Sequence, residues 1–184
     1  KDGRTTVIDQ IDYKVPFGFL GEIVDKVLGG RLVKQRIDRM FKAREIRLQR
    51  DLQAHGKYRS MPRKKILIAG SSGLIGTQLV AFLDTGGHDV YRLVRRKVEN
   101  DFEIEWDPDN GVINASDIEG FDAVIHLGGE GIGDKRWSKK RKEKILTSRT
   151  GSTALLAKTL SQIENPPEVF MVASAVGYYG HSQE

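Results

Sequence analysis

Residues 64–76 read Lys-Lys-Ile-Leu-Ile-Ala-Gly-Ser-Ser-Gly-Leu-Ile-Gly, and the rest of the sequence can be organised around them. The apolar run from Ile66 to Ala69 is typical of a short buried strand. After the glycines, Leu79, Val80 and Leu83 recur at helical spacing, which predicts a helix. A strand, a glycine-rich turn and a helix in this order indicate an α/β fold with a doubly wound parallel sheet.

The glycine-rich turn has the spacing that a dinucleotide pyrophosphate requires. Gly70 permits a tight turn, Gly73 lets backbone N–H groups approach the phosphates, and Gly76 lets the helix pack closely on the strand. The alternative is a plain turn between a strand and a helix that holds no ligand. We predict that the cofactor-binding turn consists of Gly70, Ser71, Ser72, Gly73, Leu74, Ile75 and Gly76.

Basic residues at the end of the second predicted strand, residues 89–96, bear on the choice of cofactor. NAD sites usually place Asp or Glu about 20 residues after the glycine turn. This chain has Arg95, Arg96 and Lys97 there. Because a guanidinium can pair with two phosphate oxygens, we predict NADP(H) in preference to NAD(H), with Arg95 as the first candidate ligand and Arg96 as the second. A solvated basic loop is the alternative.

A third predicted strand, Phe102 to Trp106, ends at Asp107. The residues that follow, Pro108 to Gly111, are typical of a turn. Asp107 is therefore a candidate acceptor for the adenine amino group of a cofactor, or it only forms the turn. The sequence leaves both interpretations open.

The first 54 residues have the pattern of the end of a domain. Alternating polarity in residues 4–15 predicts a half-buried strand, and apolar residues at helical spacing predict an amphipathic helix over residues 31–53. Residues 55–63 are polar and contain Gly and Pro, which is typical of a linker. Because one strand and one helix cannot bury a core alone, we expect the chain to be a piece of a longer protein.

Composition excludes several classes of protein. The 184 residues include no cysteine, which excludes a disulfide scaffold and a thiolate metal site and fits a reducing compartment such as the cytoplasm. No apolar run approaches the roughly 20 residues of a membrane span. Residues 1–63 hold 15 Lys and Arg against 8 Asp and Glu, whereas residues 64–184 hold 15 against 17. A basic segment of this kind is usually a solvated helix surface, so we expect no nucleic-acid partner. We also expect no bound metal.

Several motifs in order resemble the extended short-chain dehydrogenase/reductase superfamily, and more narrowly its epimerase-like, atypical branch. The resemblance runs from about residue 64 to the end of the chain. The motifs are Gly70-x-x-Gly73-x-x-Gly76, the predicted fourth strand Asp122 to Glu130, Arg136-Trp137, Ser148-Arg149 and Ser174 to Gly180.

Residues 1–54 resemble the C-terminal strand and helix of a START-like, polyketide-cyclase-type domain. Such an α+β helix-grip domain packs its long helix over an apolar ligand cavity. Met40 and Phe41 would then line a pocket for an apolar ligand, or they are ordinary core residues.

The dehydrogenase resemblance implies roles for individual residues. Leu127, Gly128 and Gly129 would pass beside the nicotinamide ribose and the pyrophosphate, with Gly128 replacing the Ala that is commonest there. His126 would point into the packing of the sheet rather than act in catalysis. The residues implied at the substrate pocket are Arg136 and Arg149.

Ser174 is the candidate catalytic residue, because relatives use a Ser or Thr near the end of the fifth predicted strand, residues 168–173, to hydrogen-bond the reacting oxygen of the substrate. Alignment on Tyr179-Gly180 instead puts Ala175 at the usual position of that serine. The Tyr-x-x-x-Lys pair that moves the proton in relatives would follow residue 184. We therefore expect the parent protein, rather than this piece alone, to be the active form.

These inferences combine into one reading. Residues 64–184 form the first part of a Rossmann domain, incomplete at its C-terminus, after a linker and the end of a helix-grip domain. The protein would be an NAD(P)(H)-binding oxidoreductase or epimerase that transfers hydride on a small molecule. The alternative is a non-catalytic, dinucleotide-sensing or lipid-binding protein whose cofactor is structural.

Overall fold

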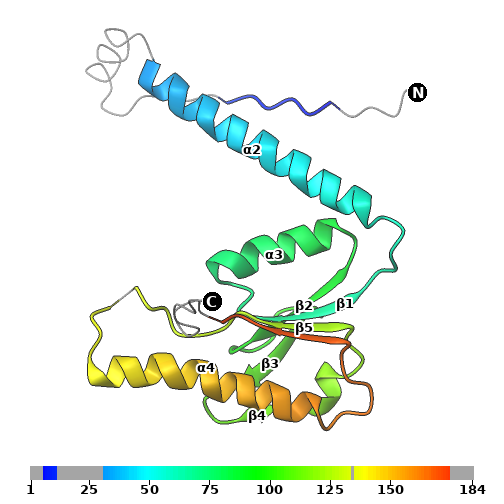
Figure 1. Cartoon of the computed structure of the whole chain (residues 1–184), viewed down its shortest axis with the longest axis vertical. Coiled ribbons are helices and arrows are strands. Elements are labelled where there is room, and N and C mark those ends of the chain that lie inside the picture. Colours follow the sequence, from blue (N-terminus) through cyan, green and yellow to red (C-terminus); the bar gives the residue numbers. More distant parts are fainter. Residues whose placement is uncertain (1–5, 12–30, 134, 175–184) are drawn as a thin grey trace, which may run out of the picture. The chain divides into compact units, whose positions relative to one another are not determined.

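The computed structural model describes residues 6–11, 31–133 and 135–174 (Figure 1). The chain divides into two compact units, residues 1–57 and residues 58–184. None of the helices in these described ranges is long and apolar enough to cross a membrane. Predictions for residues 1–5, 12–30 and 175–184, including Ala175 and Tyr178-Tyr179, lie outside the described residues.

In the first unit, the long helix α2 (Arg31–Lys57) confirms the predicted amphipathic helix but extends beyond it. Its last residues, 55–57, fall in the segment predicted as linker. Most of its apolar side chains are exposed, among them Met40, while Phe41 is half-buried. The pocket proposed for these two residues therefore stays a prediction.

The strand predicted over residues 4–15 is wrong where the structure describes it. Residues 6–11 form no strand, and Val7 and Ile8 are 62% and 86% exposed. A strand needs a neighbour to pair its backbone N–H and C=O groups. Within the described ranges no strand pairs with this segment; Asp9 instead forms an ion pair with Arg44 of α2 at 3.0 Å.

The second unit contains a six-stranded sheet with the order β4-β3-β2-β1-β5-β6. All neighbouring strands run parallel except β4, which pairs antiparallel with β3. This arrangement confirms the predicted parallel, Rossmann-like sheet. The strands are β1 (Lys65–Ala69), β2 (Asp89–Val94), β3 (Glu103–Asp107), β4 (Val112–Ile113), β5 (Ala123–His126) and β6 (Val169–Val172).

Two helices connect parallel strands on opposite faces of this sheet (Figure 1). Helix α3 (Leu74–Thr85) joins β1 to β2 and ends before Gly86-Gly87, with Gly87 at φ +88°. Helix α4 (Lys139–Leu160) lies between β5 and β6. It begins after Trp137 because the Ser138 side chain caps it by accepting a hydrogen bond from the Arg141 N–H. A short 3₁₀ helix, η1 (Ala115–Ile118), precedes β5.

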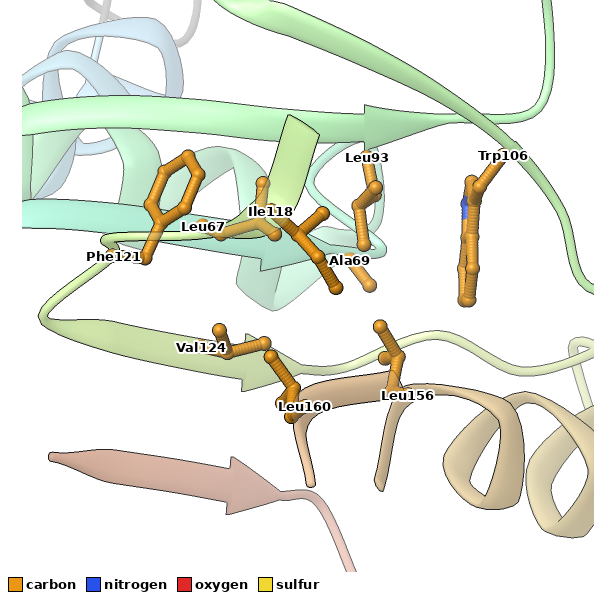
Figure 2. Close-up of a cluster of buried hydrophobic side chains, with 9 residues drawn as sticks. All are labelled: Leu67, Ala69, Leu93, Trp106, Ile118, Phe121, Val124, Leu156 and Leu160. Atoms are coloured by element: carbon orange, nitrogen blue, oxygen red, sulfur yellow. The ribbon is translucent and has the colours of Figure 1, made fainter. Parts of the chain in front are cut away.

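Side chains of β1 are buried on both faces, as expected for a central parallel strand. Ile66 and Ile68 pack with Val80 of α3. On the other face Leu67 and Ala69 belong to a cluster with Val124, Leu156 and Leu160. Leu156 and Leu160 extend from α4 toward the sheet (Figure 2).

Helical spacing in residues 137–163 predicts a long helix whose buried face consists of Ile145, Leu155, Leu156, Ala157 and Leu160. One member of this set is wrong. Ala157 is exposed, whereas Ser152 and Thr159 are buried. These two hydroxyls tolerate burial because each donates to a carbonyl one turn earlier in the helix.

Candidate functional site

The candidate site lies where the sheet order changes direction. From β1 the chain continues through α3 to β2 on one side, and it later returns to β5 on the other side of β1. Ligands of open α/β sheets bind at the carboxyl ends of the strands beside such a point. A cavity of about 730 Å³ opens there, lined by the glycine turn and by residues at the ends of β2, β3 and β5 and on α4.

The glycine turn is held by close backbone contacts. Gly70 has φ +81°, and a Cβ there would lie 2.6 Å from the Gly128 nitrogen. A Cβ on Gly76 would lie 2.2 Å from the Gly70 carbonyl oxygen. These contacts support the tight turn and close helix packing that the sequence predicted for Gly70 and Gly76. At Gly73 the nearest atom would be 3.4 Å away, so the fold itself tolerates a side chain at that position.

The N-terminus of α3 faces this cavity without a side-chain cap. Gly73 is the N-cap residue in extended conformation, and the first turn of α3 carries no acidic residue. A helix N-terminus with uncapped N–H groups attracts an anion. Ser71 and Ser72 also line the cavity, whereas Leu74 and Ile75 do not, and these two residues are 90% and 67% exposed.

Arg95 and Arg96 both line the cavity at the end of β2, but their surroundings differ. Arg96 donates to both carboxylate oxygens of Glu103 at 2.8 Å. These hydrogen bonds, with one from the Glu99 N–H, hold the pKa of Glu103 below its usual range. Arg95 is exposed and forms no hydrogen bond or ion pair within the part of the chain that the structure describes.

Asp107 ends β3 and forms the turn that follows. Its carboxylate accepts hydrogen bonds from the Asp109 N–H, the Asn110 N–H and the Asn110 side chain. The hydrogen bonds from Asn110 lower the pKa of Asp107. The cavity is lined by its neighbours Trp106, Pro108 and Asp109 instead, so the geometry favours the turn-forming interpretation of Asp107.

The segment Leu127–Gly129 lines the cavity beside the glycine turn, and its predicted contact with a cofactor stays a prediction. It is held by His126, which is 2% exposed. Nδ1 of His126 accepts from the Gly128 N–H at 3.3 Å, and Nε2 lies 2.8 Å from the Ser152 hydroxyl. An accepting Nδ1 requires a neutral ring, and burial lowers the pKa of His126 accordingly.

The glycine at position 128 is more than a small change from Ala. A Cβ there would lie 2.9 Å from the His126 ring, so this ring occupies the space that a methyl group would need. The expectation that His126 packs into the sheet agrees with its contact with Trp106, whose ring lies edge-on at 6.0 Å.

Arg149 braces the loop after β5. It donates to the carbonyls of Ile145 and Glu130 at 3.0 and 3.1 Å, and its side chain packs on Gly129. It does not line the cavity, and neither does Arg136, which is exposed. Their predicted contact with substrate therefore stays a prediction.

Glu130 in the same loop forms an ion pair with Arg141 of α4, and this hydrogen bond lowers its pKa. Arg141 also donates to the Gly131 carbonyl at 2.6 Å, and Lys144 of α4 lies 3.7 Å from a carboxylate oxygen of Glu130. These contacts tie the loop after β5 to the start of α4.

Ser174 follows β6 at the carboxyl edge of the sheet and is exposed. It is not among the residues that line the cavity. Ser174 therefore lies near the end of the strand where the sequence analysis placed it, and its catalytic role stays a prediction. No cluster of His, Cys, Asp or Glu in the described ranges could hold a metal ion.

The sequence reasoning missed several residues that line the cavity. Ser148 and Ser152 lie one turn apart on α4, and Ser148 accepts from the Glu130 N–H. Their spacing of four residues was a readable signal for a shared polar helix face. The other missed residues are Thr77, Val80, Arg92, Leu93, Val94, Glu103, Trp106, Pro108, Asp109 and Thr147.

Comparisons with known proteins agree with this geometry. The model of the NAD dependent epimerase/dehydratase family matches residues 66–184. An epimerase family protein of Mycobacterium leprae is 40% identical over 119 residues, which are 65% of this chain and 38% of that protein.

Two crystal structures are also similar to the chain. Human epimerase family protein SDR39U1, solved with NADPH, is 30% identical with a TM-score of 0.54, over 62% of this chain and 38% of that one. A nucleoside-diphosphate sugar epimerase from Corynebacterium glutamicum is 33% identical with a TM-score of 0.63, over 77% of this chain and 30% of that one.

The chain therefore spans well under half of the length of these relatives. The START-like resemblance of residues 1–54 stays a prediction. The family match covers the sheet, the glycine turn and the cavity that they form. This chain belongs to the NAD-dependent epimerase/dehydratase family.

Proposed function

We propose that the second unit binds NADP(H) in the cavity and that the whole protein is an oxidoreductase or epimerase acting on a small molecule by hydride transfer. The observation that carries this proposal is the uncapped N-terminus of α3, which opens onto a cavity at the point where the sheet order changes direction. The human relative, a structural match at 30% identity, was solved with NADPH.

The residues of the turn suit a pyrophosphate. The backbone N–H groups at the start of α3 would donate to it, and Gly73 would let it approach because no Cβ stands in the way. Leu127–Gly129, which lie beside the turn, would also bound the pyrophosphate and the nicotinamide ribose. The close contact of Gly70 with Gly128 keeps these two segments together.

Arg95 would select NADP(H) over NAD(H). It lines the cavity at the end of β2, where the 2′-position of the adenosine ribose is read in folds of this kind. Its planar guanidinium can form two charge-assisted hydrogen bonds to a phosphate.

For catalysis, a bound nicotinamide ring supplies or accepts the hydride. In this chain, Ser174 would hydrogen-bond the reacting oxygen of the substrate from the carboxyl end of β6. Arg136 and Arg149 would lie toward the substrate side of the loop after β5.

The test is a fluorescence titration of the full-length protein with NADPH and with NADH. We expect micromolar binding of NADPH, weakened about tenfold by Arg95→Ala through the loss of charge-assisted hydrogen bonds. Lys97→Ala is the control, because Lys97 is an exposed cation two residues away that does not line the cavity. Failure of both nucleotides to bind would refute the proposal, and an equal loss with Lys97→Ala would refute the role of Arg95.

A further inference from the structure

Glu103 has surroundings that the proposed function does not explain. Its side chain is only 3% exposed, although Glu103 lines the cavity together with Arg95 and Arg96. Both carboxylate oxygens accept from Arg96, and one of them also accepts from the Glu99 N–H at 2.9 Å. A buried carboxylate with these three hydrogen bonds is a built part of the site wall rather than a surface charge.

Arg96 is correspondingly tied to the loop between β2 and β3. Besides Glu103, it donates to the Lys97 carbonyl at 3.0 Å and lies 3.2 Å from a carboxylate oxygen of Glu99. One guanidinium thus holds both ends of this loop. Its charge is matched by a buried carboxylate at hydrogen-bond distance, so the pair contributes little net field to the cavity.

Two cations that line the cavity beside this corner, Arg92 and Arg95, have no carboxylate within hydrogen-bond distance in the described ranges. Arg92 pairs in register with Glu103 on the neighbouring strand and also lowers the pKa of Glu103. Because Arg96 is paired and Arg95 is not, these two adjacent arginines are not equivalent toward an anionic ligand.

We propose that Glu103 is a specificity-determining residue of the cofactor site: it sequesters Arg96 and so limits the preference for a 2′-phosphate to what Arg95 and Arg92 supply. This inference rests on the proposed binding of NADP(H). It makes the choice between NADPH and NADH depend on a buried acid of β3 in addition to the basic end of β2. Glu103 acts through Arg96 and through the field at the cavity, without contact with the cofactor.

The experiment measures dissociation constants of NADPH and NADH for the full-length protein by nicotinamide fluorescence, and the readout is their ratio. Glu103→Gln removes the buried charge and keeps the shape of the side chain. Glu105→Gln is the matched control, since it removes the same charge from an exposed position of β3 that does not line the cavity. Glu103→Gln combined with Arg96→Gln removes the pair without changing the net charge.

Glu103→Gln is expected to raise the preference for NADPH about threefold or more at low salt, because it unmasks one cation near the 2′-phosphate. Glu105→Gln and the double variant are each expected to stay within about twofold of the unmodified protein, which is the effect of screened or cancelling charges. Arg95→Ala is expected to lower the preference about tenfold, as the loss of a charge-assisted hydrogen bond would.

A double variant that loses the preference as fully as Arg95→Ala would overturn the inference, because Arg96 would then be a direct ligand. An unchanged or lower preference in Glu103→Gln would also overturn it. Thermal melting identifies a Glu103→Gln variant that does not fold, and the charge-neutral double variant then decides alone. If the unmodified protein binds neither nucleotide, the proposed function itself fails, which is a different result.

Discussion

Gly76→Ala tests how tightly α3 packs on the turn before it. Gly76 is the third residue of α3, and a methyl group there would lie 2.2 Å from the Gly70 carbonyl oxygen and 2.7 Å from the Ser71 Cα. Both atoms belong to the backbone, so no side chain can rotate away to make room. The helix would have to move away from β1 to accept the methyl group.

Two opposing effects set the size of the change. Replacing Gly by Ala inside a helix normally stabilises a protein by about 1 kcal/mol. Forcing extra volume into a packed site costs about 1–3 kcal/mol, with the upper end expected where backbone must move. The expected net result for Gly76→Ala is a loss of about 2 kcal/mol in the free energy of unfolding.

Gly151→Ala is the matched control, because Gly151 lies inside α4 with no atom within 4 Å of a Cβ built there. It is expected to stabilise the protein by about 0.5–1 kcal/mol. Urea unfolding followed by the fluorescence of Trp106, which is 5% exposed in the core, measures both variants. Equal stability of the Gly76→Ala variant and the unmodified protein would refute the close packing of α3 on the turn.

Three further predictions concern single residues. Gly73→Ala is expected to keep the stability of the fold, because the nearest atom to the new Cβ lies 3.4 Å away. It is expected to weaken NADPH binding about tenfold in a titration, because the methyl group crowds the phosphate. Unchanged affinity would contradict this prediction. Burial lowers the pKa of His126 in the folded state, so unfolded chains bind more protons below about pH 6.5 and stability falls as the pH drops from there. Urea unfolding between pH 8 and pH 5 should show a smaller fall for His126→Asn, which keeps an acceptor for the Gly128 N–H; an equal fall would exclude His126 as its source. Leu156→Ala is expected to cost about 2–5 kcal/mol of unfolding free energy, because Leu156 is fully buried against the sheet; a cost below that of an exposed control, Leu146→Ala, would contradict the packing of α4.

Local patterns were sufficient to predict most elements of the second unit. The apolar run before Gly70 and the helical spacing after Gly76 each determine a structure within a few residues. The short strand β4 was missed, because two residues carry no periodicity and only pairing with β3 makes them a strand. The strand predicted in the first unit failed for the related reason that alternation alone does not supply a pairing neighbour.

The glycine turn could be predicted from the sequence because Gly70 and Gly76 each meet a local steric demand of the backbone. The difference between Arg95 and Arg96 was not, because it depends on Glu103 in the next strand of the sheet. In the same way, the role of Arg149 as a brace depends on the course of the loop after β5. Local sequence patterns do not predict contacts between side chains that belong to different strands or loops.

The measurement that tests the central claim most directly is amide hydrogen exchange of the full-length protein with and without NADPH. Binding at the proposed site would slow the exchange of backbone N–H groups in residues 70–73 and 127–129, which line the cavity, and in the first turn of α3. Exchange in α2 would stay the same. Unchanged exchange in all of these segments at saturating NADPH, or protection confined to another part of the chain, would contradict the assignment of this cavity as the dinucleotide site.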